Sequence, residues 1–465
     1  MVMGQLATKV EVAVIGGGPG GYTAAIRAAQ LGFETVLIEK NKLGGVCTNV
    51  GCIPSKALIH AASLMKEAEA AGTMGIDAKV SVDFQKMQAW KDGIVGSLRN
   101  GIATLCKLND VEVIDGRAFF QSPTTLAVET EAGLRTIEFK KAIIATGTKP
   151  AELPNLKADH KRILDSDDIF SLKELPDRLV VVGGGYIASE MACLFSNLGS
   201  KVTVVYRGER LLKNMEPELG DLLVRKMKDN GIDLLLKSEI TGITDRMATV
   251  NGEMQLGFDK LLLATGRTVD VDGLGLEKTK ARLSEEGFVV VDETCRTLDD
   301  NIYAIGDVTA GPQLAHKAFR QGKVAAEAIA GMKSVFDNRA MPMVVFSEPE
   351  LASVGLGEEQ AKKQGYKVII GKAPFSALGR AKTLNKSDGF VKLVAAENGL
   401  VLGVHIAGTG AGDMIAEAAL AIEMAATLED IASTIHTHPT MPEALMLAAE
   451  DALGKAVDIY RGKKS

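Results

Sequence analysis

Hydrophobic and polar positions along the chain repeat one strand-helix-strand plan twice. Residues 10–39, VEVAVIGGGPGGYTAAIRAAQLGFETVLIE, place an apolar strand before a glycine-rich turn, a helix with apolar residues about 3.6 positions apart, and a second apolar strand. Residues 179–206, LVVVGGGYIASEMACLFSNLGSKVTVVY, follow the same order. Strands that alternate with helices in this way predict α/β domains built on parallel sheets.

The turn of the first unit has the spacing of a dinucleotide-binding fingerprint, Gly16-x-Gly18-x-x-Gly21. Its glycines allow a tight turn, a close approach of the backbone to a pyrophosphate, and close packing of the helix on the strand. Glu39 ends the second strand, where a carboxylate can accept a hydrogen bond from a ribose hydroxyl. The complete unit predicts a Rossmann-like domain that binds a dinucleotide.

The second unit has the same turn with its third glycine replaced, Gly183-x-Gly185-x-x-Ala188, and it predicts a second dinucleotide. Where the first unit has its acidic residue, this unit has Tyr206, followed by Arg207. A carboxylate there would bind a free 2′-hydroxyl and repel a 2′-phosphate, whereas arginine binds that phosphate with two hydrogen bonds. These residues favour NADP over NAD; the alternative is a solvated basic loop in a unit that still accepts NAD.

Two similar segments mark the limits of the second unit. KAIIATGTKP and KLLLATGRTV share a lysine, three apolar residues and Ala-Thr-Gly, and each predicts a buried strand that ends beside a nucleotide. The second domain is therefore expected to be inserted into the first. In chain order we expect the first part of the first dinucleotide domain at 1–148, the inserted domain at 149–271, the second part of the first domain at 272–343, and a C-terminal domain at 344–465.

A short strand after the insertion, in TLDDNIYAIGDVTAGPQLAHKAF, brings Asp307 to a turn before a helix. The carboxyl ends of parallel strands are where α/β sheets bind their ligands. Asp307 is therefore a candidate cofactor-binding residue, and the alternative is a carboxylate that only caps the following helix.

A pair of cysteines follows the first unit directly. Cys47 and Cys52 lie in GGVCTNVGCIPSK, where glycines and Pro54 predict a short loop that enters a helix. Cys52 would then lie at the N-terminus of that helix, where the helix dipole favours the thiolate, the form of cysteine that exchanges disulfides. Two thiols beside a dinucleotide indicate a redox-active pair that passes two electrons to it; the alternative is two buried structural cysteines.

The last third of the chain has a different pattern and no phosphate-binding loop. FVKLVAAENGLVLGVHIAG predicts a hairpin of strands and DMIAEAALAIEMAATLEDIAS predicts a helix, so we expect an α+β domain. His438 is a candidate acid/base whose tautomer Glu443 fixes; the alternative is that Glu443 only forms a capping box with Thr440 as N-cap. His436 and His438 could also bind zinc, but no further ligand has suitable spacing, so no metal is expected.

Composition excludes several classes of protein. The 465 residues are 46% hydrophobic and 24% charged, which indicates folded domains. The net charge of −6 offers no basic surface for nucleic acid, and no segment of about twenty apolar residues predicts a membrane span. Cys106, Cys193 and Cys295 stand alone and are expected to be buried, not joined in a secreted disulfide framework. Because the N-terminus has no leader pattern, we expect a cytoplasmic protein in which a disulfide is catalytic.

The cysteine segment, the two fingerprints, the two ATG segments, YAIGD and HTHPTMPEA occur in the order found in pyridine nucleotide-disulfide oxidoreductases. The likeness covers nearly the whole chain. The IPSK sequence after the second cysteine and the paired histidines make the chain similar to the dihydrolipoamide dehydrogenases of that family, whereas glutathione reductases typically carry VPKK and a single histidine. The C-terminal cysteine pair of mercuric reductases is absent from the sequence.

The resemblance implies a homodimer with one FAD per subunit at the first fingerprint and a nicotinamide cofactor at the second. It implies an ion pair between Lys56, beside the flavin, and Glu190, and it brings His438 and Glu443 of one subunit to the other subunit's disulfide. The cofactor-contact positions that it implies are Glu39, Lys56, Ala118, Thr146, Gly147, Asp307 and Ala315 for FAD, and Tyr206, Arg207 and Gly266 for the nicotinamide cofactor.

The implied reaction is the oxidation of protein-bound dihydrolipoamide with reduction of NAD(P)+, in 2-oxo acid dehydrogenase complexes or the glycine cleavage system. The partner would be a lipoyl-bearing protein, either a dihydrolipoyl acyltransferase or the glycine cleavage lipoyl protein. His438 would deprotonate the substrate thiol that attacks Cys47, and Cys52 would pass the electrons to FAD. Alternatives are an NADPH-dependent disulfide reductase for a low-molecular-weight thiol or a redox protein, and a non-catalytic flavoprotein scaffold. NAD-specific relatives usually carry Glu at the position of Tyr206, so the electron acceptor stays open.

Overall fold

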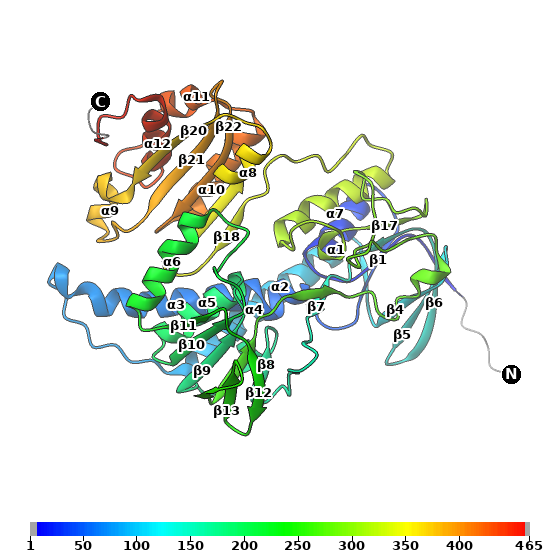
Figure 1. The fold of residues 1–465 in the computed structure, drawn as a ribbon. Coiled ribbons are helices and arrows are strands. Elements are labelled where there is room, and N and C mark those ends of the chain that lie inside the picture. The colour runs from blue at the N-terminus through cyan, green and yellow to red at the C-terminus, as the bar shows by residue number, and fades with distance from the viewer. Residues whose placement is uncertain (1–6, 461–465) are drawn as a thin grey trace.

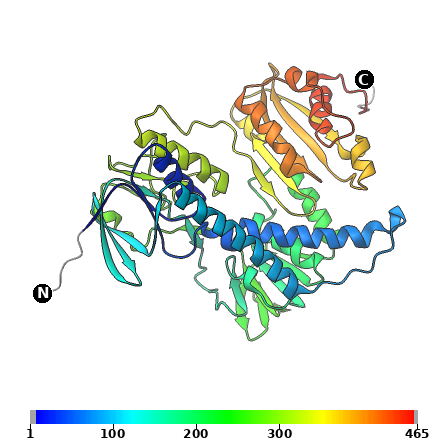
Figure 2. The same ribbon diagram turned by 180° about the vertical axis from the view of Figure 1, so that it is seen from behind.

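The computed structural model describes residues 7–460. The expectation about an N-terminal leader rests partly on residues 1–6, which lie outside the described part. Figure 1 shows two α/β domains and a C-terminal domain, and Figure 2 shows the same arrangement from behind. The predicted fold class, two Rossmann-like domains with a C-terminal α+β domain, is confirmed. None of the described helices combines the length and the apolar composition that a membrane span requires.

The first sheet has seven strands, in the order β3-β2-β1-β6-β5-β4, with β17 also paired to β6. Along β1, Val12 and Val14 pack on the helices α1, α4 and α7, whereas Ala13 and Ile15 face the side of β4 and β5, because successive side chains of a strand point to opposite faces. The strands are β1 (Thr8–Ile15), β2 (Thr35–Glu39), β3 (Glu112–Asp115), β4 (Arg117–Ser122), β5 (Thr125–Thr130), β6 (Gly133–Ile144) and β17 (Ile302–Ala304). The helices are α1 (Pro19–Gln30), α4 (Phe84–Leu108) and α7 (Ala315–Ile329). We call this part the first-sheet domain.

The second sheet has five parallel strands in the order β11-β10-β9-β15-β8. Their bounds are β8 (Ile163–Asp165), β9 (Arg178–Val182), β10 (Lys201–Tyr206), β11 (Asp233–Leu236) and β15 (Lys260–Leu263). The helices α5 (Tyr186–Asn197) and α6 (Pro217–Asp229) belong to this part, as does a three-stranded antiparallel sheet of β12 (Ile240–Thr244), β13 (Met247–Val250) and β14 (Met254–Gly257). We call it the second-sheet domain.

The chain enters and leaves the second-sheet domain through a two-stranded antiparallel ribbon. Its strands are β7 (Thr148–Pro150) and β16 (Arg267–Val269), and Thr148 pairs with Val269. After the ribbon the chain returns to the first sheet, where β17 pairs with β6. The second-sheet domain therefore interrupts the first-sheet domain.

The C-terminal domain is an antiparallel sheet covered by helices, in the strand order β18-β19-β22-β21-β20. The predicted hairpin is β21 with β22, and it is confirmed. The predicted single helix divides into α10 and α11, because Ala425 takes a left-handed φ of 53° and Thr427 caps a new helix. The strands are β18 (Met343–Val345), β19 (Leu351–Gly355), β20 (Val368–Pro374), β21 (Phe390–Ala396) and β22 (Val401–Ala407). The helices are α8 (Glu358–Lys363), α9 (Gly379–Thr383), α10 (Ala411–Glu423), α11 (Leu428–Ser433) and α12 (Glu443–Leu453).

A buried ion cluster joins the second-sheet domain to the C-terminal domain. The Lys392 side chain on β21 is only 4% exposed. Its Nζ lies 2.6 Å from Glu216 Oε1, 2.9 Å from Glu218 Oε1 and 2.7 Å from Glu358 Oε2. Glu216 precedes α6, Glu218 lies in its first turn, and Glu358 begins α8. We call these four residues the Lys392 cluster; its charge-assisted hydrogen bonds connect three separate segments of the chain.

Candidate functional site

A cavity of about 1100 Å³ lies where the first-sheet domain meets α5 of the second-sheet domain. Pockets for drug-sized ligands have about 300–1,000 Å³, so this cavity has room for a dinucleotide. Most of the predicted FAD-site and redox residues line it. They are Gly16, Gly18, Glu39, Cys47, Cys52, Lys56, Ala118, Thr146, Gly147, Glu190, Asp307 and Ala315.

The first glycine turn fits the FAD that the resemblance implies there. A Cβ atom at Gly21 would lie 1.8 Å from the Gly16 carbonyl oxygen, so α1 packs this closely only with glycine. A Cβ at Gly18 would have no neighbour nearer than 3.9 Å, which leaves its backbone open to the cavity at the start of α1. Among the described residues, the buried Thr146 Oγ1 has no hydrogen-bond partner, and a ligand in the cavity would supply one.

Glu39, the predicted ribose acceptor, lies beside this turn in the wall of the cavity. Its Oε2 accepts a hydrogen bond from the Gly17 N–H at 2.6 Å and its Oε1 accepts one from Asn41 N–H at 2.7 Å. Burial raises the pKa of Glu39, and the two N–H donors act against that rise. Each carboxylate oxygen keeps a further lone pair for a ligand hydroxyl.

The two cysteines lie on consecutive short elements. Cys52 is the first residue of α3 (Cys52–Ala70), as the sequence predicted. Cys47 lies within a short helix, α2 (Gly45–Val50), so the predicted loop is wrong at this point. The helix starts there because Gly44 takes a left-handed φ of 92°, and Gly51 then separates the two helices. Both thiols face the same cavity.

The two thiols differ in their tendency to ionise. The interaction between the two sulfurs raises the pKa of Cys47 and lowers that of Cys52. Burial opposes the lowering of the Cys52 pKa, whereas the Lys56 ammonium adds to it. Cys52 also lies at the positive end of the α3 dipole. The structure therefore favours Cys52 as the thiolate of the pair.

Lys56 and Glu190 form the ion pair that the resemblance implied. Lys56 Nζ on α3 lies 2.8 Å from Glu190 Oε2 on α5, and the Glu190 side chain is 3% exposed. The other carboxylate oxygen of Glu190 accepts a hydrogen bond from the Phe346 N–H at 3.0 Å. The Lys56 ammonium also lies 4.6 Å from the centre of the Phe346 ring. These contacts hold the ammonium in the wall that carries the cysteines.

Asp307 lies on the 3-10 turn Gly306–Val308, between β17 and α7, and lines the cavity. The alternative that it caps the following helix is wrong, because α7 begins only at Ala315 after Leu314 as N-cap. Burial raises the pKa of Asp307, and the positive charges of Lys317 and Arg267 oppose this. Asp307 therefore belongs to the wall of the space that a cofactor would fill.

The second glycine turn repeats the packing of the first. A Cβ at Gly183 would lie 2.2 Å from the Ala264 carbonyl oxygen, whereas a Cβ at Gly185 would meet nothing within 4 Å. In the described part of the chain, Thr265 Oγ1 is buried without a hydrogen-bond partner, as is its counterpart in the first ATG segment. The predicted Gly266 follows it and does not line the large cavity. The residues of this turn fit a second nucleotide.

Tyr206 takes the place that an acidic residue has in the first unit. A Cβ at Gly184 would lie 2.5 Å from Tyr206 Cδ1, so the aromatic ring lies over the glycine turn. Arg207 is exposed and, within residues 7–460, makes no ion pair, whereas Arg210 lies 3.4 Å from Asp221 Oδ1. The Arg207 guanidinium is therefore available to an anionic ligand group.

His438 and Glu443 meet in the C-terminal domain. His438 Nδ1 donates to Glu443 Oε1 at 2.8 Å, and Glu443 Oε2 accepts the Thr440 N–H at 2.7 Å. Glu443 thus contacts both residues, His438 through Oε1 and the Thr440 N–H through Oε2. The predicted N-cap is wrong: α12 begins at Glu443 after Pro442, and the Thr440 hydroxyl bonds to the Thr437 carbonyl instead.

The His438 imidazole is exposed and lies outside the cavity of its own chain. Its side chain is 76% exposed. Neither His438 nor Glu443 lines the cavity that holds the cysteines, and Figure 1 shows α12 well away from α2. Burial raises the pKa of Glu443, but hydrogen bonds from the Thr440 N–H and from His438 outweigh it and lower the pKa. An ionised Glu443 fixes the imidazole with Nε2 free to take a proton.

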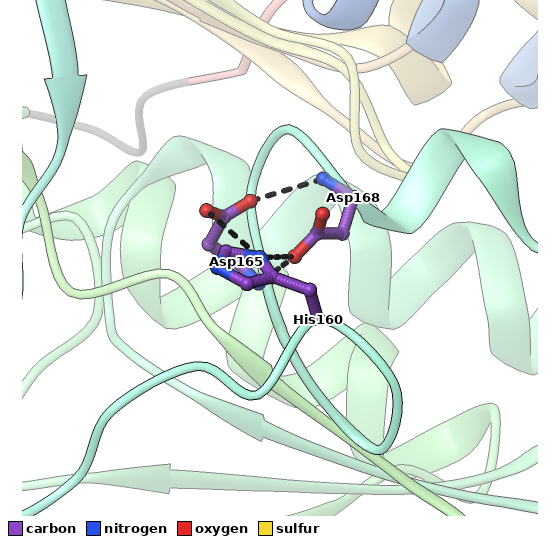
Figure 3. A group of neighbouring side chains, drawn as sticks. All are labelled: His160, Asp165 and Asp168. Atoms are coloured by element: carbon purple, nitrogen blue, oxygen red, sulfur yellow. Dashed lines mark hydrogen bonds and ion pairs between the residues drawn. The ribbon is translucent and has the colours of Figure 1, made fainter.

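No metal site is assigned to the histidines. His436 Nε2 lies 2.9 Å from Glu417 Oε1 and its Nδ1 lies 2.9 Å from the Thr434 carbonyl oxygen, so this ring does not pair with His438 on a metal. Figure 3 shows a further group of possible ligands in the described chain, where His160 lies beside Asp165 and Asp168. There the His160 Nδ1 donates to Asp168 Oδ2 at 2.9 Å, and both aspartates accept backbone N–H groups of their own turn. These hydrogen bonds account for the group without an ion.

The sequence model of one family matches most of the chain. Pyridine nucleotide-disulphide oxidoreductase matches residues 10–322, and the dimerisation domain of the same family matches residues 341–449. The chain belongs to the pyridine nucleotide-disulphide oxidoreductases. Its cofactors are accordingly FAD and NAD(P), and the first glycine turn and cavity fit the FAD. The C-terminal domain is a dimerisation domain, which supports a homodimer.

Relatives with assigned names match over their full length. The dihydrolipoyl dehydrogenase of Bacillus subtilis is 46% identical over 471 residues, covering 99% of this chain and 100% of that protein. The dihydrolipoyl dehydrogenase of Geobacillus stearothermophilus is 47% identical over 468 residues, covering 99% of each chain. Among solved structures, the flavoprotein disulfide reductase RclA of Escherichia coli has a TM-score of 0.86 at 30% identity, covering 95% of this chain and 99% of that chain. LpdA of Mycobacterium tuberculosis has a TM-score of 0.89 at 26% identity, covering 96% and 99%.

Arg267 is a charged residue of the cavity wall that the sequence analysis did not single out. Its side chain is 8% exposed. It donates to Thr148 Oγ1 at 3.0 Å on the partner strand of the ribbon, and to Ser166 Oγ and Asp167 Oδ1 at 2.9 and 2.8 Å in the second-sheet domain. Arg267 thus fixes the ribbon to the second-sheet domain. Its place directly after the second Ala-Thr-Gly was the only indication in the sequence.

Proposed function

We propose that this protein is a dihydrolipoyl dehydrogenase, which oxidises dihydrolipoamide carried by a partner protein and reduces NAD(P)+. The observation that carries this proposal is the Cys47 and Cys52 pair in the wall of the cavity that also holds the first glycine turn. The full-length identity to dihydrolipoyl dehydrogenases supports it. Gly16, Gly18 and Glu39 would hold FAD in the cavity, and the bound flavin would supply two-electron transfer between the cysteines and NAD(P)+.

The two cysteines take different parts in the exchange. A substrate thiolate attacks Sγ of Cys47 in the disulfide form and releases Cys52 as a thiolate, the form that its lowered pKa favours. The second substrate thiol then attacks the substrate sulfur of the mixed disulfide, which releases Cys47 and forms lipoamide. The cysteine pair has gained two electrons, and Lys56 balances the negative charge of Cys52.

His438 acts as the base that takes the thiol proton of the substrate. Glu443 holds Nδ1, so the free Nε2 accepts the proton and later returns it to the Cys47 sulfur. Because His438 lies away from the cavity of its own chain, it serves the cysteines of the other subunit of the homodimer. Each active site therefore needs both subunits.

The remaining assignments follow from the same proposal. The lipoyl group belongs to an acyltransferase of a 2-oxo acid dehydrogenase complex or to the lipoyl protein of glycine cleavage. The protein works in the cytoplasm, where the few cysteines outside the redox pair stay reduced. We place the domain limits at 1–148 and 272–343 for FAD, 149–271 for NAD(P) and 344–465 for dimerisation, because the ribbon of β7 and β16 lies at both ends of the insertion.

The nicotinamide site favours NADP. Tyr206 covers the glycine turn where a carboxylate would bind a 2′-hydroxyl, and exposed Arg207 beside it can bind a 2′-phosphate. Steady-state oxidation of dihydrolipoamide with NAD and NADP side by side tests this choice. A strong preference for NAD would overturn the assignment of Arg207 and leave the reaction itself in place.

Replacement of Cys52 by serine tests the reaction. The variant should keep FAD and still pass electrons from NAD(P)H to an artificial acceptor, but it should lose oxidation of dihydrolipoamide, because no disulfide can form. Flavin absorbance and the artificial-acceptor rate are the internal controls for folding. Normal turnover of dihydrolipoamide by Cys52→Ser would refute the scheme.

A second candidate function is an NADPH-dependent disulfide reductase for another thiol. Arg207 favours it, as does the structural similarity to the flavoprotein disulfide reductase RclA. Competition between lipoamide and small disulfides, with NADPH as donor, separates the two. A higher kcat/KM for a small disulfide than for lipoamide would favour this candidate.

A further inference from the structure

Two polar side chains of α7 form hydrogen bonds to the turn that carries Asp307. Lys317 Nζ donates to the carbonyl oxygens of Gly306 and Thr309 and to Thr309 Oγ1, each at 3.1 Å. One turn further along α7, Gln321 Oε1 accepts the Gly306 N–H at 2.8 Å. Both backbone groups of Gly306, and both ends of the turn, are therefore fixed by the helix.

Lys317 is a costly residue at this place. The residue is 2% exposed, and burial disfavours an ammonium, which lowers the pKa of Lys317. It also lies in the first turn of α7, where the helix dipole disfavours a cation. An apolar side chain of the same length would avoid both costs. The ammonium therefore has a task that packing alone does not explain.

The role of the ammonium concerns Asp307, which belongs to the same turn and lines the cavity. Asp307 lines the cavity, and within the described chain no side chain or backbone group is hydrogen-bonded to its carboxylate. Gly306, which precedes it, takes a left-handed φ of 73°, a conformation that the bonds to Lys317 and Gln321 maintain. The positive charge of Lys317 also opposes neutralisation of the buried Asp307.

We propose that Lys317 is a positioning residue of the FAD site: it fixes the turn at 306–309 so that Asp307 presents its carboxylate to the hydroxyl groups of the cofactor. The inference rests on the FAD of the proposed function, and it does not depend on which thiol or which nicotinamide the enzyme uses. Lys317 acts through Asp307 and does not line the cavity itself.

The test is FAD binding to the apoprotein, measured as a Kd by quenching of flavin fluorescence. Lys317→Met should raise this Kd at least about tenfold, because a charged hydrogen-bond partner is removed from a buried turn. Asp307→Asn should raise it similarly. The double variant should bind FAD about as well as Asp307→Asn alone, because Lys317 works through that carboxylate. Lys323→Met is the matched control on the exposed face of α7 and should bind as the parent protein does.

A spectroscopic readout separates positioning from general stability. The visible circular dichroism of bound FAD should change in Lys317→Met in the same direction as in Asp307→Asn, and stay unchanged in Lys323→Met. Where Lys317→Met fails to fold, Thr309→Val removes one acceptor and keeps the ammonium. It should raise the Kd about threefold or more in the parent protein, and not in the Asp307→Asn background.

Two results would overturn the inference. One is a Kd for Lys317→Met, or for Thr309→Val where that variant is used, equal to that of the parent. The other is an increase that is fully additive with Asp307→Asn. Failure of the enzyme to oxidise dihydrolipoamide would count against the proposed function and leave this test unaffected, since its readout is the binding of FAD.

Discussion

Removal of the Lys392 charge should loosen the attachment of the second-sheet domain to the C-terminal domain. Lys392→Met deletes three charge-assisted hydrogen bonds and leaves Glu216, 6% exposed, without its cation. Loss of one partner from a buried ion pair costs about 3–5 kcal/mol. With an unfolding entropy of about 2.1 cal/mol/K per residue over 465 residues, the Tm should fall by about 3–5 °C. Differential scanning calorimetry of the dimer measures this change.

The loss of Tm in Lys392→Met should also depend on pH. Burial raises the pKa of Glu218, but its hydrogen bonds to Lys372 and Lys392 outweigh this and lower the pKa. Hydrogen bonds to Lys362 and Lys392 lower the pKa of Glu358. A carboxylate whose pKa is lowered on folding stabilises the fold above its unfolded pKa of about 4.3, and this contribution is lost as the pH falls through its folded value. The difference in Tm between the parent and Lys392→Met should therefore be full at pH 7 and shrink below about pH 4.

The matched control is Lys362→Met. Lys362 also contacts Glu358, at 2.7 Å, but its side chain is 47% exposed, so this surface pair contributes about 0–1 kcal/mol. A Tm for Lys392→Met as high as that of Lys362→Met would refute the reasoning. So would a difference that is the same at pH 7 and in acid.

Three further variants test the sites. His438→Gln should slow dihydrolipoamide oxidation by about 10²–10⁴-fold and leave NAD(P)H oxidation by an artificial acceptor nearly unchanged; equal losses in both stopped-flow assays would contradict the base assignment. Arg207→Ala should raise the KM for NADP about tenfold or more and change the KM for NAD little, and parallel changes in steady-state kinetics would argue against a phosphate contact. Gly21→Ala should lose bound flavin, because its Cβ would lie 1.8 Å from a carbonyl oxygen. The control Gly101→Ala has open space at its Cβ, so it should keep flavin and stabilise α4 by about 0.5–1 kcal/mol. Flavin retention by both variants would contradict the packing argument.

Local rules were enough to predict the features whose cause lies within a few residues. Cys52 begins α3 because Gly51 ends the preceding helix. Pro54 is tolerated in the first turn of the new helix. The three isolated cysteines are buried, as their apolar or mixed surroundings indicated. Glu443 shows the limit of such rules, because the pattern suggested either a histidine partner or a capping role. The structure shows that Oε1 contacts His438 and Oε2 accepts the Thr440 N–H.

Contacts between distant segments could not be predicted from the sequence. Lys392 meets glutamates that are 34 to 176 residues away, and no spacing rule links them. The ring of Tyr206 over Gly184 depends on how β10 lies beside the glycine turn, which pattern alone does not give. Lys317 looked like an ordinary helix residue, because neither its burial nor its position under Asp307 follows from helical periodicity.

The ion pair of Lys56 and Glu190 has a consequence for the chain as a whole. Lys56 comes from α3, which precedes the insertion in the chain, Glu190 from the second-sheet domain, and the Phe346 N–H that holds Glu190 from the start of the C-terminal domain. All three parts of the fold meet within one hydrogen-bonded group beside the redox cysteines. A fragment that lacks any of the three parts would lose one member of this junction, so we expect the redox site to need all three parts in one chain.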